Sequence, residues 1–294
     1  MKEKEAWTAW KPLLGKGKIS FIGLAETLEG GQCFDWHKVA EAHWRGKIRL
    51  SLVEIMFSEE SVFWRTYQEK PIRESELRYY FRTESSYEES IEDLPWRSDP
   101  VLAQCVDAFL GLRILRQPIE QVLLYFLLSS AKSIPQIKQM GESVCREYGT
   151  SLGLGFWSFP GWEILAKVSE NKLRTLKLGY RAKYVFETAK TLREKPNWLN
   201  SLLNLSYEDA KNELLTLPGI GAKIADCVLL FGGDFLQAFP MDTWIEKSLD
   251  KRYFLKGWSK SQKAHFAKIH FGNYAGLAQQ FLFSGERLGI FDTP

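Results

Sequence analysis

Residues 217–227 read LPGIGAKIADC, and this stretch decides the fold. The pattern before it, SYEDAKNELLTL, begins with a Ser and Glu signature that is typical of a helix start, and the pattern after it is almost continuously apolar. A tight turn between two helical patterns predicts a helix-hairpin-helix motif. Gly219 and Gly221 permit backbone conformations that other residues disfavour, and free N–H groups at a helix start attract phosphate. We therefore predict that both glycines contact the DNA backbone.

Lys223 and Asp242 form the candidate catalytic pair. Lys223 falls in the first turn of the second predicted helix, where the helix dipole and burial both favour a neutral, nucleophilic amine. A lysine that only binds phosphate would fit the same hairpin. Asp242 lies in FPMDTW at 239–244, at the expected start of another helix. It could be an ordinary N-cap there, but an N-cap and a catalytic carboxylate are not exclusive.

Several further motifs occur in an order that resembles the 8-oxoguanine DNA glycosylases of the helix-hairpin-helix superfamily. The resemblance covers nearly the whole chain. It implies a bifunctional enzyme of base-excision DNA repair, a glycosylase and abasic-site lyase, with Lys223 as nucleophile and Asp242 as its partner. The motifs are GGQCFDW (30–36), GLRILRQPIEQVLLYFLLSS (111–130), FPGWEILA with LKLGYRAKYV (159–185), LPGIGAKIADC (217–227) and LAQQFLFS (277–284).

The chemistry expected from this pair needs no cofactor and no metal, although carbonyls of the hairpin could bind a monovalent cation. Asp242 stabilises the positive charge that develops on the deoxyribose as the glycosidic bond loosens, and neutral Lys223 attacks C1′ to displace the base. The resulting Schiff base permits β-elimination and cleavage of the strand.

A pocket for the extruded base is expected around four residues. Cys227 follows Lys223 by one helical turn, and Phe283 lies in LAQQFLFS, so these two are the predicted walls. Gln279 precedes Phe283 by four residues and could bond the Watson–Crick edge of a purine. Gly31 could bring a backbone carbonyl to the N7–H that oxidised guanine carries and guanine lacks. The alternatives are a buried core role for Cys227 and Phe283 and a hairpin turn at Gly30 and Gly31, which would not exclude base recognition.

Tyr180 and Arg181, in LGYRAKY, resemble the residues with which the family opens the duplex. The tyrosine ring could wedge beside the extruded base, and the arginine could bind the base left behind or a phosphate. Trp244 stands two residues after Asp242, where the family often has a phosphate-binding histidine. We therefore include Trp244 among the predicted DNA contacts.

The SSAKSI loop departs from the family pattern. The family usually has asparagines there, followed by an arginine that reads the orphan cytosine, whereas this chain has Ala131, Lys132 and Ser133 and then Gln136. Lys132 and Gln136 are the candidate DNA contacts of the loop. Because an uncharged amide can exchange its donor and acceptor by rotating, we predict a weak dependence on the base opposite the lesion.

Composition and charge are consistent with a DNA-binding enzyme. Residues 1–110 contain 15 basic and 19 acidic residues, a net charge of −4, and residues 111–294 contain 24 and 17, a net charge of +7. The second part is therefore expected to meet phosphate. The four cysteines lack zinc or iron–sulfur spacing, so reduced thiols are expected, and this separates the chain from the endonuclease III and adenine glycosylase branches.

No apolar stretch reaches the roughly 18 residues of a membrane span, and the first residues, MKEKEAWTAWK, lack a secretory signal. We expect an intracellular monomer, in the cytoplasm or nucleoid of a bacterium or the nucleus of a eukaryote, that binds double-stranded DNA containing a damaged base and no membrane.

The expected fold class is α+β and mostly α. Short apolar and β-branched segments over residues 18–68, including KISFIGLAETL, predict an antiparallel sheet, and apolar residues recur every three or four from about residue 74. We predict an N-terminal β-containing domain over 1–110 and a helical helix-hairpin-helix domain over 111–294.

Two other functions remain open from the residues. One is an alkylated-base glycosylase of the same fold, although monofunctional enzymes of that type use water and ordinarily lack the hairpin lysine. The other is a non-catalytic protein that binds damaged DNA, with Lys223 holding only phosphate. A structural scaffold with an incidental hairpin is the least favoured reading.

Overall fold

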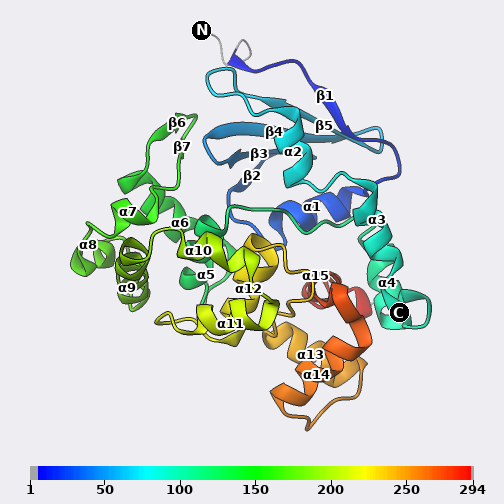
Figure 1. Cartoon of the computed structure of the whole chain (residues 1–294). Coiled ribbons are helices and arrows are strands. Elements are labelled where there is room, and N and C mark those ends of the chain that lie inside the picture. Colours follow the sequence, from blue (N-terminus) through cyan, green and yellow to red (C-terminus); the bar gives the residue numbers. More distant parts are fainter. Residues whose placement is uncertain (1–5, 293–294) are drawn as a thin grey trace.

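The computed structural model describes residues 6–292, and it consists of one antiparallel sheet followed by a large helical part (Figure 1). The five strands are hydrogen-bonded in the order β1-β5-β4-β3-β2. The predicted α+β fold is confirmed. The strands are β1 Lys11–Leu14, β2 Trp36–Ala40, β3 His43–Ile48, β4 Ser51–Ser58 and β5 Ser61–Thr66.

One face of the sheet packs on helix α1, Phe21–Glu29. Cross-strand register places Ile55 opposite Trp44 on one neighbouring strand and opposite Trp64 on the other, and all three are buried. Leu24 of α1 joins the same apolar cluster. Along β5 the buried residues Val62, Trp64 and Thr66 alternate with partly exposed ones, which is the period of two that an antiparallel strand with one covered face requires.

The prediction of a strand in KISFIGLAETL was wrong, because these residues form most of helix α1. Ser20 caps the helix by accepting a hydrogen bond from the Gly23 N–H at 3.0 Å. Leu24 and Leu28 are four residues apart and fully buried, so the helical period of the apolar residues outweighs the strand preference of isoleucine and phenylalanine.

Helices occupy most of the chain from Glu74 onward, as the periodicity predicts. A short hairpin of β6 Ser151–Gly153 and β7 Phe156–Trp157 interrupts them. The helices are α2 Glu74–Tyr80, α3 Ser85–Glu92, α4 Pro100–Ala108, α5 Ile119–Leu128, α6 Ile134–Tyr148, α7 Trp162–Leu165, α8 Glu170–Thr175, α9 Arg181–Glu194, α10 Trp198–Ser201, α11 Tyr207–Leu215, α12 Ala222–Gly232, α13 Thr243–Arg252, α14 Lys260–Phe271 and α15 Ala275–Leu288, with 3-10 turns η2 Pro95–Arg97, η3 Leu202–Asn204, η4 Gly272–Tyr274 and η5 Ile290–Asp292.

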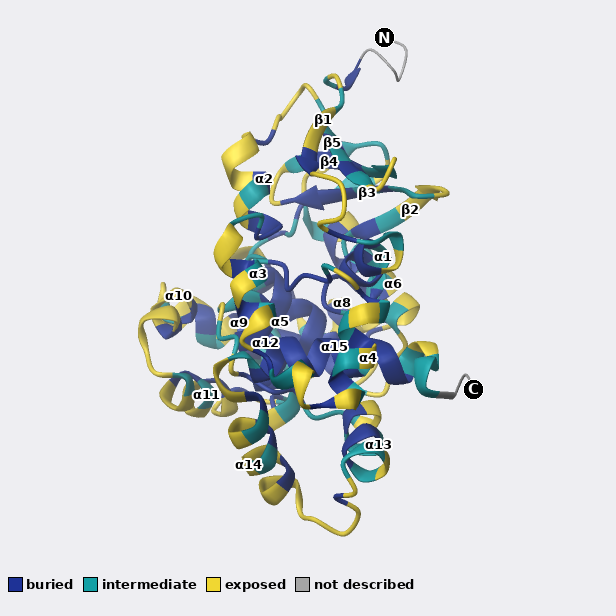
Figure 2. Cartoon of the chain, turned by 90° about the vertical axis from the view of Figure 1, so that its right-hand side faces the viewer, coloured by how far each residue is buried: buried dark blue, intermediate teal, exposed yellow. Residues whose placement is uncertain are grey.

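The centre of the helical part is formed by α5, α12 and α15, which are largely buried in Figure 2. In α5 every residue except Glu120 is buried, and Phe126 stacks on Phe231 of α12 with ring centres 5.6 Å apart. The same core also takes up Phe34 and Tyr87, which precede residue 110. The division of the chain at residue 110 stays a prediction.

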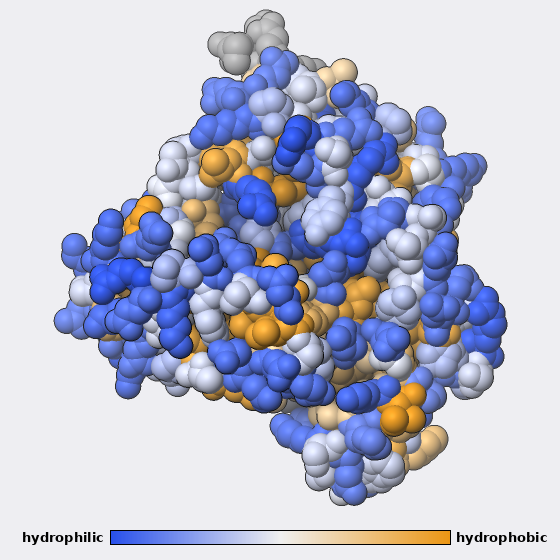
Figure 3. Space-filling view, viewed as in Figure 1, coloured by the Kyte–Doolittle hydropathy of each residue, from blue (hydrophilic) through white to orange (hydrophobic). Residues whose placement is uncertain are grey.

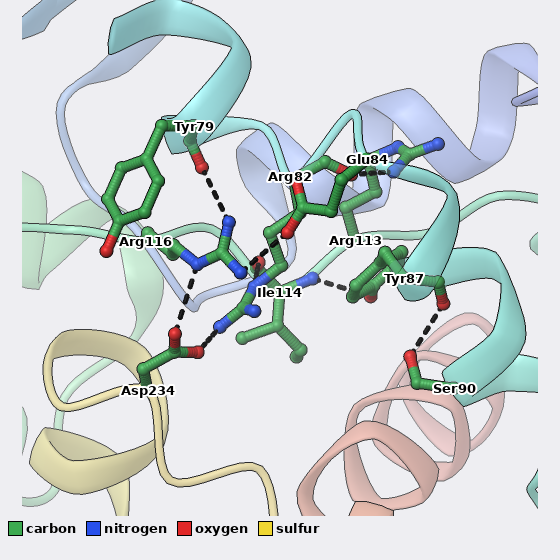
Figure 4. Close-up of polar contacts among 9 residues, drawn as sticks. All are labelled: Tyr79, Arg82, Glu84, Tyr87, Ser90, Arg113, Ile114, Arg116 and Asp234. Carbon is green, nitrogen blue, oxygen red and sulfur yellow. Dashed lines mark hydrogen bonds and ion pairs between the residues drawn. The ribbon is translucent and has the colours of Figure 1, made fainter.

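A polar junction joins the end of α12 to the region around α2 (Figure 4). Asp234, just beyond α12, is paired with Arg82 and with Arg116, whose Nε lies 3.1 Å from its carboxylate. Arg82 also donates to the Ile114 carbonyl at 2.7 Å, and Arg116 pairs with Glu84 at 2.6 Å. Burial, with the nearby charge of Arg116, lowers the pKa of Arg82 to about 10. The junction fixes the C-terminal end of α12.

The surface is largely hydrophilic on the face seen in Figure 3, with hydrophobic side chains exposed near its middle. Within residues 6–292, no helix combines the length and apolar character that crossing a bilayer requires. All four cysteines, Cys33, Cys105, Cys145 and Cys227, are buried free thiols.

Candidate active site

The helix-hairpin-helix predicted from LPGIG is present as α11, a turn and α12. Gly219 has φ +81°, and a Cβ built on it would lie 2.4 Å from the ring of Tyr184, so only glycine fits this position without a shift. Gly221 is the exposed N-cap residue of α12. Its place leaves the first N–H groups of α12 at the surface of the hairpin, as a phosphate clamp requires.

Beside this hairpin lies a small pocket of about 50 Å³ that gathers residues from α5, α12, α15 and the loop after α1. It brings together both predicted catalytic residues and all four predicted base-pocket residues, which are far apart in the sequence. The pocket is lined by Gly30, Gly31, Phe126, Lys223, Cys227, Phe231, Pro240, Asp242, Gln279, Gln280 and Phe283.

Lys223 is half-buried in the first turn of α12, and its Nζ lies 5.4 Å from the ring centre of Phe126. Cys227 follows it by one turn and is 3% exposed. Burial raises the pKa of Cys227 to about 12, against the opposing charge of Lys223. Cys227 therefore presents an uncharged thiol to the pocket, which suits a wall that contacts a base.

Asp242 is the N-cap of α13, so the N-cap role predicted as an alternative is real. Its Oδ1 accepts hydrogen bonds from the N–H groups of Trp244 at 3.0 Å and Ile245 at 2.9 Å. Burial raises the pKa of Asp242 above 3.8, opposed by the Ile245 N–H and by the charge of Lys223. Because the capping bonds use only one oxygen and the residue still lines the pocket, the cap holds the carboxylate in place there.

Gly31 lies at the edge of the pocket with φ +88°, and a Cβ on it would approach Ile134 to 3.0 Å. The next residue, Gln32, is completely buried and fixes the loop. Its side chain donates to the Arg113 carbonyl at 2.7 Å and accepts from the Leu115 N–H at 2.8 Å. Gly31 follows Gly30, the C-cap of α1, so the chain turns here between a helix and β2, and the hairpin turn considered as an alternative is not formed.

Gln279 and Phe283 reach the pocket from α15, one turn apart. Gln279 is 4% exposed, and its Oε1 has no hydrogen-bond partner among the described residues. A buried acceptor without a partner is rare in folded proteins. Its position beside Lys223 and Asp242 is what a base-reading residue needs.

Five lining residues were not predicted: Gly30, Phe126, Phe231, Pro240 and Gln280. The spacing in α12 could have indicated Phe231, because it follows Cys227 by four residues on the face that carries the predicted nucleophile. Phe126 belongs to a uniformly apolar run, in which nothing distinguishes a pocket residue from the core.

Tyr180 and Arg181 lie at the start of α9, outside the pocket. Tyr180 is 49% exposed, whereas Arg181 is 4% exposed. The Arg181 guanidinium lies 4.3 Å from the Tyr180 ring centre and donates to the carbonyls of Ser130 and Leu178. In this arrangement Arg181 ties α9 to the loop between α5 and α6, and its contact with DNA stays a prediction.

Lys132 is exposed on that loop, and Gln136 lies in the first turn of α6. The Gln136 side chain accepts a hydrogen bond from the Ser133 N–H at 3.1 Å and so caps its own helix. Trp244 is 39% exposed at the start of α13, with the Nζ of Lys247 5.2 Å from its ring centre. The DNA-binding roles of Lys132, Gln136 and Trp244 stay predictions.

A larger groove of about 850 Å³ lies between the β3–β4 turn, α2 and the residues after α12. It is lined by Tyr79, Arg116 and Asp234 but contains no lysine or cysteine that could act as a nucleophile. Within residues 6–292, no group of three His, Cys, Asp or Glu side chains is placed to hold a metal ion. The small pocket, which holds Lys223 beside Asp242 at the helix-hairpin-helix turn, is the candidate active site.

Comparison with known proteins gives a consistent result. A family model described as the N-terminal domain of 8-oxoguanine DNA glycosylase matches residues 17–123. The N-glycosylase/DNA lyase OGG1 of Arabidopsis thaliana is 31% identical and aligns with 94% of this chain and 80% of its own length. An N-glycosylase/DNA lyase of Saccharomyces cerevisiae is 27% identical, over 91% of this chain and 84% of its own length.

A solved structure is similar over the whole fold. The 8-oxoguanine glycosylase/lyase of Clostridium acetobutylicum, in complex with double-stranded DNA containing cytosine opposite 8-oxoguanine, superposes with a TM-score of 0.84. The two proteins are 28% identical, and the match covers 97% of this chain and 99% of the other.

Proposed function

The chain belongs to the 8-oxoguanine DNA glycosylase family, and on that premise we propose that Lys223 and Asp242 carry out its reaction. The enzyme is a DNA glycosylase with abasic-site lyase activity that acts on 8-oxoguanine in base-excision repair. One observation supports the residue assignment above all others. A single small pocket holds a lysine, a carboxylate and two glutamines beside a helix-hairpin-helix turn.

In the proposed reaction, the free amine of Lys223 forms a bond to C1′ as the bond from C1′ to the base nitrogen breaks. The base leaves with the bonding electrons and takes up a proton. Asp242, held by its capping bonds, stabilises the positive charge that develops on the sugar. The lysine nitrogen then loses a proton, the C1′–O4′ bond breaks and O4′ takes up a proton, which gives the imine. The imine acidifies the neighbouring C2′–H, and β-elimination removes this proton and breaks the C3′–O bond with departure of the 3′ phosphate.

The proposed substrate is double-stranded DNA in which the damaged base is extruded into the pocket. Cys227 and Phe283 would face the base, Gln279 would bond its Watson–Crick edge, and the carbonyl of Gly31 would accept from N7–H. Gly219 and Gly221 would lie against the backbone. We further propose that the protein works as a monomer inside the cell, and light scattering of the purified chain tests the first of these points.

Borohydride trapping tests the nucleophile directly. If Lys223 forms an imine, reduction during incubation with a duplex containing 8-oxoguanine leaves the protein covalently attached to DNA. Lys223→Gln is expected to abolish the adduct while the duplex is still bound, and Lys70→Gln, at an exposed position, serves as the matched control. An adduct that persists in Lys223→Gln refutes the assignment. Binding with neither trapping nor base release in the parent chain would indicate a non-catalytic damage-binding protein.

A further inference from the structure

A second glutamine in the pocket is not explained by the reaction described so far. Gln280, next to Gln279 in α15, is 2% exposed and lines the pocket with Lys223 and Asp242. Its Nε2 has no hydrogen-bond partner among the described residues, and the Oε1 of Gln279 is equally unpaired. Two adjacent buried amides therefore each leave an atom unsatisfied beside the catalytic pair.

An unpaired buried N–H is costly, and folded proteins usually avoid it. Another buried glutamine of this chain, Gln121, follows the usual rule, because its Nε2 donates to the carboxylate of Asp35. Gln280 differs from Gln121 in this respect, and like Gln279 it leaves an atom without a partner at the pocket. An apolar residue of the same length would fill the same space without an unsatisfied donor. The amide is therefore best explained by a hydrogen-bond partner that does not belong to the protein, such as a bound substrate.

The chemistry of the extruded base provides such a partner. The Watson–Crick edge of 8-oxoguanine presents two donors, N1–H and the 2-amino group, and one acceptor, the carbonyl oxygen at C6. N7–H lies on the Hoogsteen edge, which adjoins the Watson–Crick edge at the C6 oxygen. If Gly31 accepts from N7–H, the adjoining Watson–Crick edge would face the two glutamines of α15, which line the same pocket. An acceptor from Gln279 and a donor from Gln280 would complement N1–H and the C6 oxygen, and either amide can rotate to present the required atom.

We propose that Gln280 is a second base-reading residue, which donates a hydrogen bond to the C6 carbonyl oxygen of extruded 8-oxoguanine beside Gln279. This inference rests on the proposed function. It predicts that the pocket distinguishes an oxo group at C6, as in 8-oxoguanine, from the amino group of 8-oxoadenine. Sites built around such a bond reject analogues that leave the protein group unpaired.

The first test compares base release with strand cleavage at an abasic site, where no base is present to be read. Under single-turnover conditions, Gln280→Met is expected to slow release of 8-oxoguanine by about ten- to a hundredfold, and abasic-site cleavage by far less. Gln280→Glu keeps the shape but replaces the donor with an acceptor, so it should show the same selective loss. Equal slowing of both reactions, or no change in either, would overturn the inference.

Thermal melting separates base reading from a structural role. Because the Nε2 of Gln280 has no partner among the described residues, Gln280→Met should melt at or above the temperature of the parent chain. Gln121→Met is the matched control: it removes a bonded buried amide, so it should lower the melting temperature and leave the ratio of base release to abasic-site cleavage unchanged. A drop in melting temperature for Gln280→Met as large as that for Gln121→Met would contradict the proposal.

Equilibrium binding identifies the atom that is read. In a Lys223→Gln background, which holds the substrate intact, the Gln280→Met change should weaken binding of an 8-oxoguanine duplex about tenfold relative to an 8-oxoadenine duplex. Equal effects on the two duplexes would refute the C6 contact. Failure of the parent chain to release 8-oxoguanine at all would instead refute the proposed function, so the two failures are distinguishable.

Discussion

The polar side chains near the two ends of helix α12 differ in whether they have partners within the protein. At the N-terminal end, Lys223 faces a pocket in which Gln279 and Gln280 leave buried polar atoms without partners. Just beyond the C-terminal end, Asp234 is paired with two arginines, and each of these has further partners (Figure 4). Two glutamines lack partners where a substrate is expected, whereas Asp234 is fully engaged where the helix is held.

We therefore expect the two ends of α12 to have different roles, one in the reaction and the other in stability. A helix of 11 residues is about 16 Å long and behaves as a stiff rod, so fixing one end restricts the other. The ion pairs at Asp234 carry no chemistry but set the position from which Lys223 projects. Substitutions at the pocket end should therefore change rates, and substitutions at the junction end should change stability.

The largest effect is expected at Asp242. Asp242→Asn removes the charge that stabilises the transition state, and base release should slow by about 100- to 1,000-fold. Asparagine is an equally good N-cap, so the urea midpoint should stay close to that of the parent chain. Single-turnover kinetics and urea unfolding measure the two quantities. Parallel losses of rate and stability would mean that Asp242 is only a cap.

The opposite behaviour is expected at Asp234. Asp234→Ala leaves the 3% exposed Arg82 without its carboxylate partner, and stability should fall by about 1–3 kcal/mol. Urea unfolding measures this loss. Base release by the fraction that remains folded should stay within about threefold of the parent rate. Asp93→Ala, at an exposed acidic residue, is the control and should change neither quantity. A large loss of rate without a loss of stability would contradict the idea that the Asp234 end of α12 serves stability alone.

A smaller effect should appear in the pH dependence of the rate of base release. Burial raises the pKa of Asp242 above 3.8, and only the ionised carboxylate stabilises the developing charge. As pH falls through this raised pKa, Asp242 takes up a proton, so base release should decline at a higher pH than an ordinary aspartate would give. Rates measured across the acid range check this limb, which should be absent in Asp242→Asn. An unchanged limb in that variant would assign it to another group.

The smallest effect is expected from the base opposite the lesion. Gln136 is already engaged as a helix cap, and the Arg181 guanidinium donates to the Ser130 carbonyl of the loop, so both side chains have partners within the protein. Release rates for 8-oxoguanine opposite each of the four bases should lie within about tenfold of one another. Gln136→Arg should introduce a preference for cytosine. A strong cytosine preference in the parent chain would show that Arg181 or Lys132 leaves its present position to read that base.

Much of this site could be predicted from the sequence because its signals are local. The turn at Gly219 needs a glycine, the spacing of Lys223 and Cys227 places them on one helix face, and an aspartate before α13 is typical of an N-cap. Each of these features is determined by a few neighbouring residues. Local signals also account for the helices after Glu74, whose apolar residues recur with the helical period.

The features that escaped prediction depend on contacts between distant segments. Arg181 has the residue type of a DNA contact, but its burial against Ser130 depends on how α9 packs on the loop after α5. The pairing of Asp234 with Arg82 joins residues that are 152 positions apart. Gln280 has no special pattern in the sequence. Only the packing of α15 shows that its amide is left without a partner.

The four buried cysteines have a consequence for the conditions under which this enzyme works. Burial raises the pKa of Cys33, Cys105, Cys145 and Cys227, those of the last two to about 11 and about 12. Peroxides attack the thiolate far more readily than the thiol, and they also need access to it. The oxidising chemistry that converts guanine into the substrate should therefore find little thiolate to attack at these four positions, including the one in the wall of the pocket.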